Sequence, residues 1–362
     1  MKVLILSCDT GEGHNSAGRA LSDYFTRRGV ECEMLNALRF YPRALAALIS
    51  KGHVFIYRKL PLLFGAGYRM EEKHTSQLMI KGIEKAAGAL TRYILEGGYD
   101  AALCVHAFPA LMLTFIQHSD PLPIRTLFVA TDYTASPSCD RIRPDVCVIP
   151  DASLTDDFAA AGIRRETIAP CGIPVRAALY QKLPSAEAKK RVGIDPSHRH
   201  LLIMTGSMGC GPMEELTQLL ANLLPASYDV SVACSNNEQL IRRMQRAFRK
   251  NPNIHICGYI DNISAMMDSA DLFLTKPGGI STTEAMVKGL PMVLVNVVGG
   301  CETPNLQFFV SHGGAATAQT PEQIAELCRQ LLYDDARRGA MHDALVRMQG
   351  KPAAAAICDC LE

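Results

Sequence analysis

Residues Val3-Leu4-Ile5-Leu6-Ser7-Cys8-Asp9-Thr10-Gly11-Glu12-Gly13-His14 join a short apolar run to a glycine-containing turn. Apolar residues at helical spacing follow, namely Ala17, Ala20, Leu21, Tyr24 and Phe25. A buried strand, a tight turn and an amphipathic helix in this order form a β/α unit. The same order returns at 200–204, an apolar run that ends at Thr205-Gly206-Ser207-Met208-Gly209 and precedes a predicted helix over 213–223. The chain is therefore expected to contain two β/α halves.

Short apolar runs continue along both halves, with helical stretches between them. Strands are predicted at 30–35, 101–105, 126–130, 146–149, 230–233, 254–257, 272–275 and 292–296, and further helices at 77–95 and, basic and amphipathic, at 237–249. Strands that alternate with helices indicate parallel sheets, so the predicted fold class is α/β, with two tandem Rossmann-like, doubly wound domains. The predicted limits are an N-terminal domain over 1–176, a hinge over 177–198, a C-terminal domain over 199–346, and an extension over 347–362 that could pack back on the N-terminal domain.

The composition excludes several classes of protein. Lys and Arg number 37 against 36 Asp and Glu, a formal net charge of +1, whereas nucleic-acid-binding proteins usually carry a clear basic excess. The thirteen cysteines are scattered and only Cys358 and Cys360 lie close together, so no metal site or disulfide framework is predicted, and a reducing cytoplasm is indicated. No apolar stretch reaches the roughly 18 residues of a membrane-spanning helix, and residues 1–5 are too short a run for a signal peptide.

Ligands of doubly wound sheets bind at the carboxyl ends of the strands, so the residues that follow each strand are the candidates. After the first strand, Gly11 and Gly13 form a turn that lacks the third glycine of a dinucleotide fingerprint, because Ser16 stands there. His14 enters the helix and is a candidate general base, although it could simply cap the helix. His106 and Thr131-Asp132 follow later strands, and Asp132 is as consistent with orienting a histidine as with an ordinary turn.

The densest group of candidates is Lys276-Pro277-Gly278-Gly279-Ile280-Ser281-Thr282-Thr283-Glu284. A helix that begins after paired glycines and carries hydroxyls suits a diphosphate, and Glu284 would reach a ribose diol. The alternative is an ordinary capped helix, with Ser281 and Glu284 as a capping box. Further candidates for the same ligand are Gly206, Ser207, Gly258, Tyr259, Cys301, Glu302 and Asn305.

With these motifs in order, the chain resembles the monogalactosyldiacylglycerol synthase and processive diacylglycerol glucosyltransferase family over nearly its whole length. The matching pieces are Gly11-x-Gly13-His14, His106-x-x-Pro109, Thr131-Asp132-Tyr133, Gly172 to Arg176, Gly258-Tyr259, Lys276 to Ala285 and Glu302-x-x-Asn305-x-x-Phe308. It also resembles, more distantly, the peptidoglycan lipid-intermediate N-acetylglucosaminyltransferase. Both resemblances imply the GT-B fold, with an acceptor domain, a UDP-sugar domain and a cleft between them.

The resemblance also implies roles. Gly206, Ser281 and Thr282 would contact the diphosphate, Glu284 the ribose, Gly258 and Tyr259 the uracil, and Glu302 and Asn305 the sugar. His14 would deprotonate a lipid alcohol, with Asp132 nearby and Gly11, Gly13, His106, Pro109 and Thr131 on the acceptor side. The reaction would invert the donor linkage and use no metal or cofactor. Cys301 stands where bacterial glucolipid synthases usually have Gln, which leaves glucose, galactose and N-acetylglucosamine open as the transferred hexose.

Residues 39–70 combine six cations with many apolar side chains and contain no Asp or Glu. Such a segment suits an anionic membrane surface, and the alternative is an amphipathic helix packed on its own domain. The prediction is peripheral attachment to the inner face of the cell membrane. Two other functions stay open: a UDP-sugar epimerase of the same architecture, and a UDP-sugar sensor that has lost transfer activity.

Overall fold

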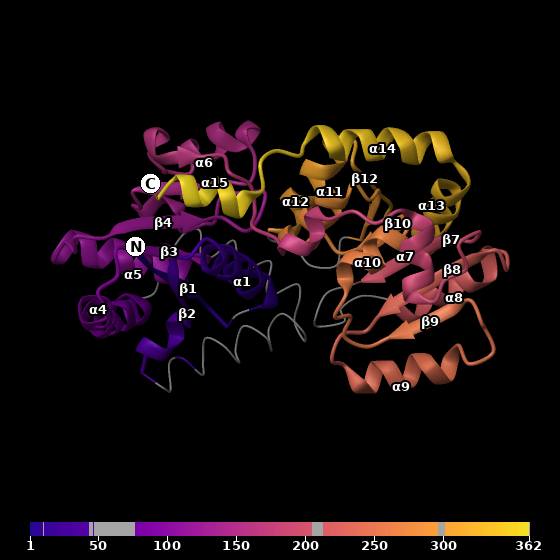
Figure 1. Ribbon diagram of the computed structural model, residues 1–362, viewed down its shortest axis with the longest axis horizontal. Helices are drawn as coiled ribbons and strands as arrows, with labels where there is room; N and C mark the ends of the chain where they lie inside the picture. The colour runs from indigo at the N-terminus through magenta and orange to yellow at the C-terminus, as the bar shows by residue number, and fades with distance from the viewer. Residues whose placement is uncertain (10, 43–45, 47–76, 205–212, 296–300, 362) are drawn as a thin grey trace. The chain divides into compact units, whose positions relative to one another are not determined.

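The computed structural model describes residues 1–9, 11–42, 46, 77–204, 213–295 and 301–361 (Figure 1). The chain divides into two compact units, each built around one six-stranded sheet. The first unit comprises residues 1–177, 298–301 and 350–362, and the second comprises 178–297 and 302–349.

The first sheet has the strand order β2-β1-β3-β4-β5-β6, and every neighbouring pair is parallel. β1 is an interior strand in which Val3 lies opposite Cys32 on one side and Ala101 on the other. Val3 to Leu6 are fully buried, which explains why this strand is a continuous apolar run instead of an alternating one. The strands are β1 (Lys2–Ser7), β2 (Glu31–Asn36), β3 (Ala101–Cys104), β4 (Arg125–Val129), β5 (Val146–Val148) and β6 (Ile168–Ala169).

Helix α1 of this unit begins at Glu12, directly after Gly11, so Gly13 lies in the helix and not in the predicted turn. The helix buries Ala17, Leu21 and Phe25, and it ends before Gly29, whose φ of 73° is a left-handed conformation that glycine adopts without strain. The helices of the first unit are α1 (Glu12–Arg27), α4 (Gln77–Gly97), α5 (Ala107–Ser119), α6 (Thr155–Ala160) and α15 (Ala353–Asp359), with 3₁₀ turns η1 (Ala37–Phe40), η2 (Cys139–Arg141), η3 (Ala152–Leu154) and η4 (Arg165–Thr167). A further 3₁₀ turn, η5 (Ala177–Tyr180), lies at the boundary, and all but its first residue belong to the second unit.

The second sheet repeats the arrangement in the order β12-β11-β10-β7-β8-β9, again entirely parallel. Its strands are β7 (Arg199–Met204), β8 (Tyr228–Ala233), β9 (Ile254–Cys257), β10 (Leu272–Thr275), β11 (Met292–Leu294) and β12 (Ala315–Thr317). Its helices are α7 (Ser185–Val192), α8 (Met213–Leu223), α9 (Glu238–Ala247), α10 (Ile263–Ser269), α11 (Gly279–Lys288), α12 (Glu302–Ser311), α13 (Pro321–Tyr333) and α14 (Asp335–Arg347).

Residues 178–198 of the predicted hinge, 177–198, are grouped with the second unit. Its helix α7 packs against α10, and the buried Lys189 ammonium lies 2.9 Å from an Asp271 carboxylate oxygen and donates to the His198 carbonyl. A buried ion pair holds this segment in place. At the other end of the chain, α15 lies in the first unit and contacts α1.

The direction of winding reverses once in each sheet. In the first sheet the reversal lies between β1 and β3, and in the second between β7 and β10. The loops at such a point leave the sheet in opposite directions and open a crevice at the carboxyl ends of the strands. We therefore expect a ligand-binding site near the residues that follow β1, β3 and β10. Among the described residues, no helix combines the length and the apolar character needed to cross a bilayer.

Candidate active site

His14 lies at the reversal point of the first sheet, in the first turn of α1. Its Nδ1 is 2.9 Å from the main-chain carbonyl oxygen of Val105, the residue after β3, and 2.9 Å from the hydroxyl oxygen of Thr131, which follows β4. Three neighbouring strands thus position a single imidazole. The predicted grouping of His14 with Thr131 is present in the structure.

The contact with Val105 decides which ring nitrogen carries the proton. A carbonyl oxygen can only accept, so Nδ1 must donate, and in the neutral ring the lone pair is on Nε2. The Thr131 hydroxyl oxygen shares that donor. Burial lowers the pKa of His14, an effect that the negative charge of Asp132 and the Val105 hydrogen bond partly oppose. The ring is therefore neutral near pH 7, with a basic nitrogen available at Nε2.

His106 packs its ring edge against His14, with the ring centroids 4.5 Å apart and an interplanar angle of 75°. As the N-cap of α5, its Nδ1 accepts a hydrogen bond from the Phe108 main-chain N–H at 3.1 Å. Pro109 follows in the first turn of α5 and is buried. His106 is thus a capping residue that also forms one wall beside His14.

The turn between β1 and α1 is braced by side chains that the sequence analysis did not select. The Asp9 carboxylate accepts hydrogen bonds from the side-chain amides of Asn15 and Asn36. Asn36 ends β2, so Asp9 ties the first turn of α1 to the neighbouring strand. A cluster of polar residues at two adjacent strand ends was the signal that could have revealed this contact. Gly11 is the N-cap of α1 in an extended conformation, and Gly13 is the residue before His14 in the helix.

The reversal point of the second sheet brings together two predicted candidates. The Lys276 ammonium, directly after β10, lies 2.6 Å from the Glu302 carboxylate, which is buried at the start of α12. The fully buried Asn305 donates its side-chain N–H to the carbonyl of Pro277 at 2.9 Å. Lys276, a donor-site candidate, and Glu302, expected at the sugar, form an ion pair with each other, and Asn305 fixes the Pro-Gly-Gly turn.

Helix α11 starts three residues earlier than a capping box with Ser281 as the N-cap would require. Its N-cap is Gly278 and its first residue Gly279, so Ser281 is inside the first turn and the capping-box prediction is wrong. The buried Thr282 donates its hydroxyl to the carbonyls of Gly278 and Gly279, at 2.9 and 3.1 Å. Because Gly278 has no side-chain cap, the first main-chain N–H groups of α11 point out of the helix start, where an anion is favoured.

The remaining donor-side candidates are spread over neighbouring strand ends. Gly258 and Tyr259 follow β9, and Tyr259 is 58% exposed, so its ring is accessible. Glu284 is buried one turn into α11. Cys301 is half-buried immediately before α12. Gly206 and Ser207 lie outside the described residues, as does nearly all of the segment 39–70.

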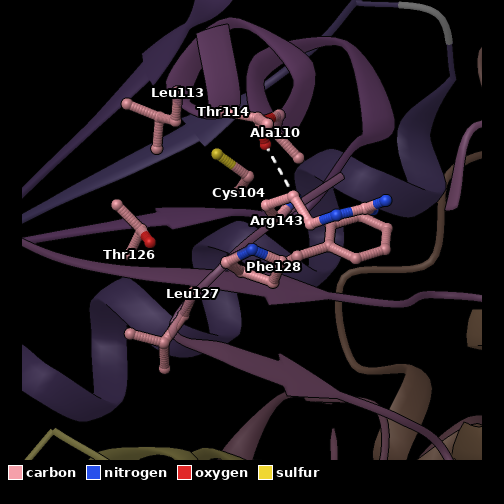
Figure 2. Close-up of a pocket in the computed structure, with 9 residues that line it drawn as sticks. Cys104, Ala110, Leu113, Thr114, Thr126, Leu127, Phe128 and Arg143 are labelled. Atoms are coloured by element: carbon pink, nitrogen blue, oxygen red, sulfur yellow. Dashed lines mark hydrogen bonds between the residues drawn. The ribbon is translucent and has the colours of Figure 1, made fainter. Parts of the chain in front are cut away.

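A small pocket lies in the first unit between β3, β4 and α5 (Figure 2). Its volume of about 10 Å³ is close to that of one water molecule, and its rim includes Cys104, Phe128 and Arg143. The main-chain N–H of Arg143 donates to the Thr114 hydroxyl across it, at 2.9 Å. This pocket is too small for a sugar or a lipid chain, so it is not part of the candidate site.

Comparison with known families assigns the two halves separately. Residues 14–175 match the monogalactosyldiacylglycerol (MGDG) synthase family, and residues 200–349 match the glycosyltransferase family 28 C-terminal domain. The first match begins at His14, and the second spans β7 to α14. The first match therefore includes His14 and β3 but not β1, and the second includes both strands at the reversal point of its sheet, β7 and β10.

Curated and solved proteins extend the comparison. The processive diacylglycerol beta-glucosyltransferase of Bacillus pumilus is 24% identical over 353 residues, which cover 94% of this chain and 89% of the relative. The crystal structure of Acinetobacter baumannii MurG superposes with a TM-score of 0.61 at 16% identity and covers 99% of both chains. A Staphylococcus aureus MnaA–UDP structure gives a TM-score of 0.66 at 13% identity, with 99% and 95% covered. Two tandem doubly wound units of this kind are the GT-B fold, which confirms the predicted fold class.

Proposed function

We propose that this chain is a member of the monogalactosyldiacylglycerol synthase family with a glycosyltransferase family 28 C-terminal domain, and that it transfers a hexose from a UDP-sugar to diacylglycerol. The product is a β-glycolipid made at the membrane surface on the cytoplasmic side, with inversion at the anomeric carbon. A relative named for this reaction matches along nearly the whole chain, which supports the proposal.

The observation that carries the proposal is the tautomer of His14. Its Nδ1–H is donated to Val105, so Nε2 is the nitrogen that can accept a proton. As the acceptor hydroxyl oxygen attacks the anomeric carbon, its proton moves to Nε2, the bond from that carbon to the UDP oxygen breaks, and UDP leaves with the bonding electron pair. Asp132 stabilises the imidazolium that forms, because its charge favours the protonated ring.

On the donor side, we place the diphosphate at the N-terminus of α11. The exposed N–H groups there and the Lys276 ammonium offset the charge that develops on departing UDP, so the scheme requires neither a metal ion nor a cofactor. Lys276 then exchanges part of its contact with Glu302 for the diphosphate, and Glu302 is released toward the hexose hydroxyls. Tyr259 offers an accessible ring to the uracil, and Glu284 is assigned to the ribose.

A donor panel tests the proposal. Purified protein is incubated with UDP-glucose, UDP-galactose or UDP-N-acetylglucosamine, with and without diacylglycerol vesicles, and both UDP release and product mass are measured. Diacylglycerol-dependent release, with a product one hexosyl residue heavier than the lipid, is expected for at least one donor. Lipid-independent conversion of the sugar would indicate an epimerase, and tight UDP binding without any turnover would indicate a sensor; either result would overturn the proposal.

A further inference from the structure

Helix α9 separates apolar and cationic side chains onto opposite faces. Leu240 and Met244 are buried against the core of the second unit, as is Phe248 just beyond the helix. Five cations face solvent along the helix and the turn after it, namely Arg242, Arg243, Arg246, Arg249 and Lys250. We call these five residues the basic face of α9. Residues 238–250 contain one acid, Glu238, in a chain whose total formal charge is only +1.

Two of these five cations form ion pairs within the second unit. Arg242 pairs with Glu238 at 2.6 Å, and Arg243 pairs with Glu214 at 2.7 Å. Within the part of the chain that the structure describes, no carboxylate forms an ion pair with Arg246, Arg249 or Lys250. These three side chains form a positive surface at the C-terminal end of α9. Cations there also interact favourably with the helix dipole.

We propose that the basic face of α9 is a contact surface for an anionic phospholipid bilayer. The inference rests on the proposed function, because an enzyme that glycosylates diacylglycerol must meet its acceptor at a membrane. An amphipathic helix with a cationic solvent side is complementary to anionic headgroups. The exposed side of α9 carries no aromatic residue, since Phe248 is buried, so the stacking contacts typical of single-stranded nucleic acid binding are absent from it. Part of the membrane contact is thereby assigned to the second unit.

The test compares two triple variants with the same loss of charge. The first is Arg246→Gln/Arg249→Gln/Lys250→Gln, which leaves the paired Arg242 and Arg243 intact. The control is Lys190→Gln/Arg337→Gln/Arg347→Gln, which removes three exposed cations from α7 and α14; α14 is drawn on the side of the second unit away from α9 (Figure 1). Co-sedimentation is measured with phosphatidylcholine vesicles that contain phosphatidylglycerol, and with phosphatidylcholine alone.

Each cation near an anionic surface contributes about fivefold to partitioning, so the α9 triple is expected to bind phosphatidylglycerol vesicles on the order of 100-fold more weakly. The control should bind nearly as the wild type does. The wild-type affinity should fall as salt is raised and should be low for phosphatidylcholine alone. An equal loss in both triples, or no loss in either, would contradict the proposal.

Two further measurements separate this inference from the proposed function. With diacylglycerol dispersed in a neutral detergent, the α9 triple should turn over at the wild-type rate, because no charged bilayer is involved. If the wild type has no turnover on any acceptor but the α9 triple still loses vesicle binding, the proposed function is wrong, whereas the assignment of the basic face as a membrane contact is supported. If the basic face instead binds an oligonucleotide in preference to the vesicles at the same salt, the bilayer assignment is wrong.

Discussion

The chemistry proposed for His14 depends on one main-chain carbonyl. Val105 accepts the proton of Nδ1, and this contact alone assigns the basic lone pair to Nε2. The imidazole is positioned by residues after β3 and β4, which are far from it in sequence. A histidine that merely capped α1 would have no need for this second contact, which favours the catalytic interpretation of the motif.

The pH dependence of turnover should report the protonation state of His14. The protonated imidazole cannot act as a base, so activity is lost as the pH falls through the pKa of His14. Because burial lowers that pKa, we expect the acid limb of kcat/KM to lie below about pH 6.5, the usual pKa of histidine. Asp132→Asn should move the limb to still lower pH, because the carboxylate favours the protonated ring. A rate profile measured from pH 4 to 9 checks both shifts, and an unmoved limb in the Asp132 variant would contradict them.

Removal of the imidazole should separate catalysis from donor binding. We expect His14→Gln to lower kcat by on the order of 10²-fold or more while the affinity for UDP, measured by calorimetry, stays close to that of the wild type. The reason is that His14 belongs to the first unit and the donor residues to the second. A parallel loss of both quantities would mean that His14 has a structural role.

Substitutions of Lys276 and Glu302 should separate stability from UDP binding on the donor side. Lys276→Met removes the cation assigned to the diphosphate and leaves the buried Glu302 without that ammonium, so we expect roughly 1–3 kcal/mol less unfolding free energy and a 10-fold or greater loss of UDP affinity. The double variant Lys276→Met/Glu302→Gln should recover most of the stability, measured by urea denaturation, but not the affinity. Recovery of the affinity would remove Lys276 from the donor site.

Helix α11 carries the donor-side candidates, and its two ends are fixed by different means. At its start, the hydroxyl of Thr282 bonds back to the glycine carbonyls, and this contact holds the turn. At its end, Gly289 adopts φ of 67° and its carbonyl accepts a hydrogen bond from His342 Nδ1 at 2.6 Å. The position of α11 therefore depends on α14 as well as on its own sequence.

A matched pair of glycine substitutions tests that end of α11. Gly193 closes α7 with φ of 80° and has no atom within 4 Å of an added Cβ, whereas a Cβ on Gly289 would lie 2.7 Å from the His342 ring. Gly193→Ala should cost about 1 kcal/mol of stability from the left-handed backbone alone. Gly289→Ala should cost clearly more in the same urea titration, because the imidazole must also move. Equal losses of stability in the two variants would show that the His342 ring of α14 moves without cost to accommodate the added Cβ.

At the level of the whole chain, the C-terminal helix contributes to the stability of the N-terminal unit. Ile357 of α15 is fully buried, and α15 contacts α1. The last residues of the sequence thus complete the core of the unit that holds His14. The proposed base depends on a segment more than 300 residues away along the chain, and this dependence can be measured.

Ile357→Ala should lower the stability of the first unit by about 2–5 kcal/mol, the usual range for such a truncation in a core. Hydrogen exchange should show reduced protection in β1 and α1, with little change in α8 and α13 of the second unit. As a control, Asp359→Asn removes only the exposed ion pair with Lys351 and should leave the stability close to that of the wild type. Loss of protection centred on the second unit would contradict this assignment.

Most of the strands could be predicted from the sequence alone, because buried parallel strands are continuous apolar runs. The short strands β6 and β12 and several helices were not predicted. The same reasoning selected Lys276, which follows such a run directly, and His14, which follows the turn after one. It could not predict that Nδ1 of His14 donates to Val105, that Lys276 binds Glu302, or that α11 begins at Gly279. These features depend on which strands become neighbours, and contacts between residues distant in sequence are set only when the sheets form. Local sequence thus determined these strands and helices, whereas tertiary structure decided the tautomer of His14 and the pairing of Lys276 with Glu302.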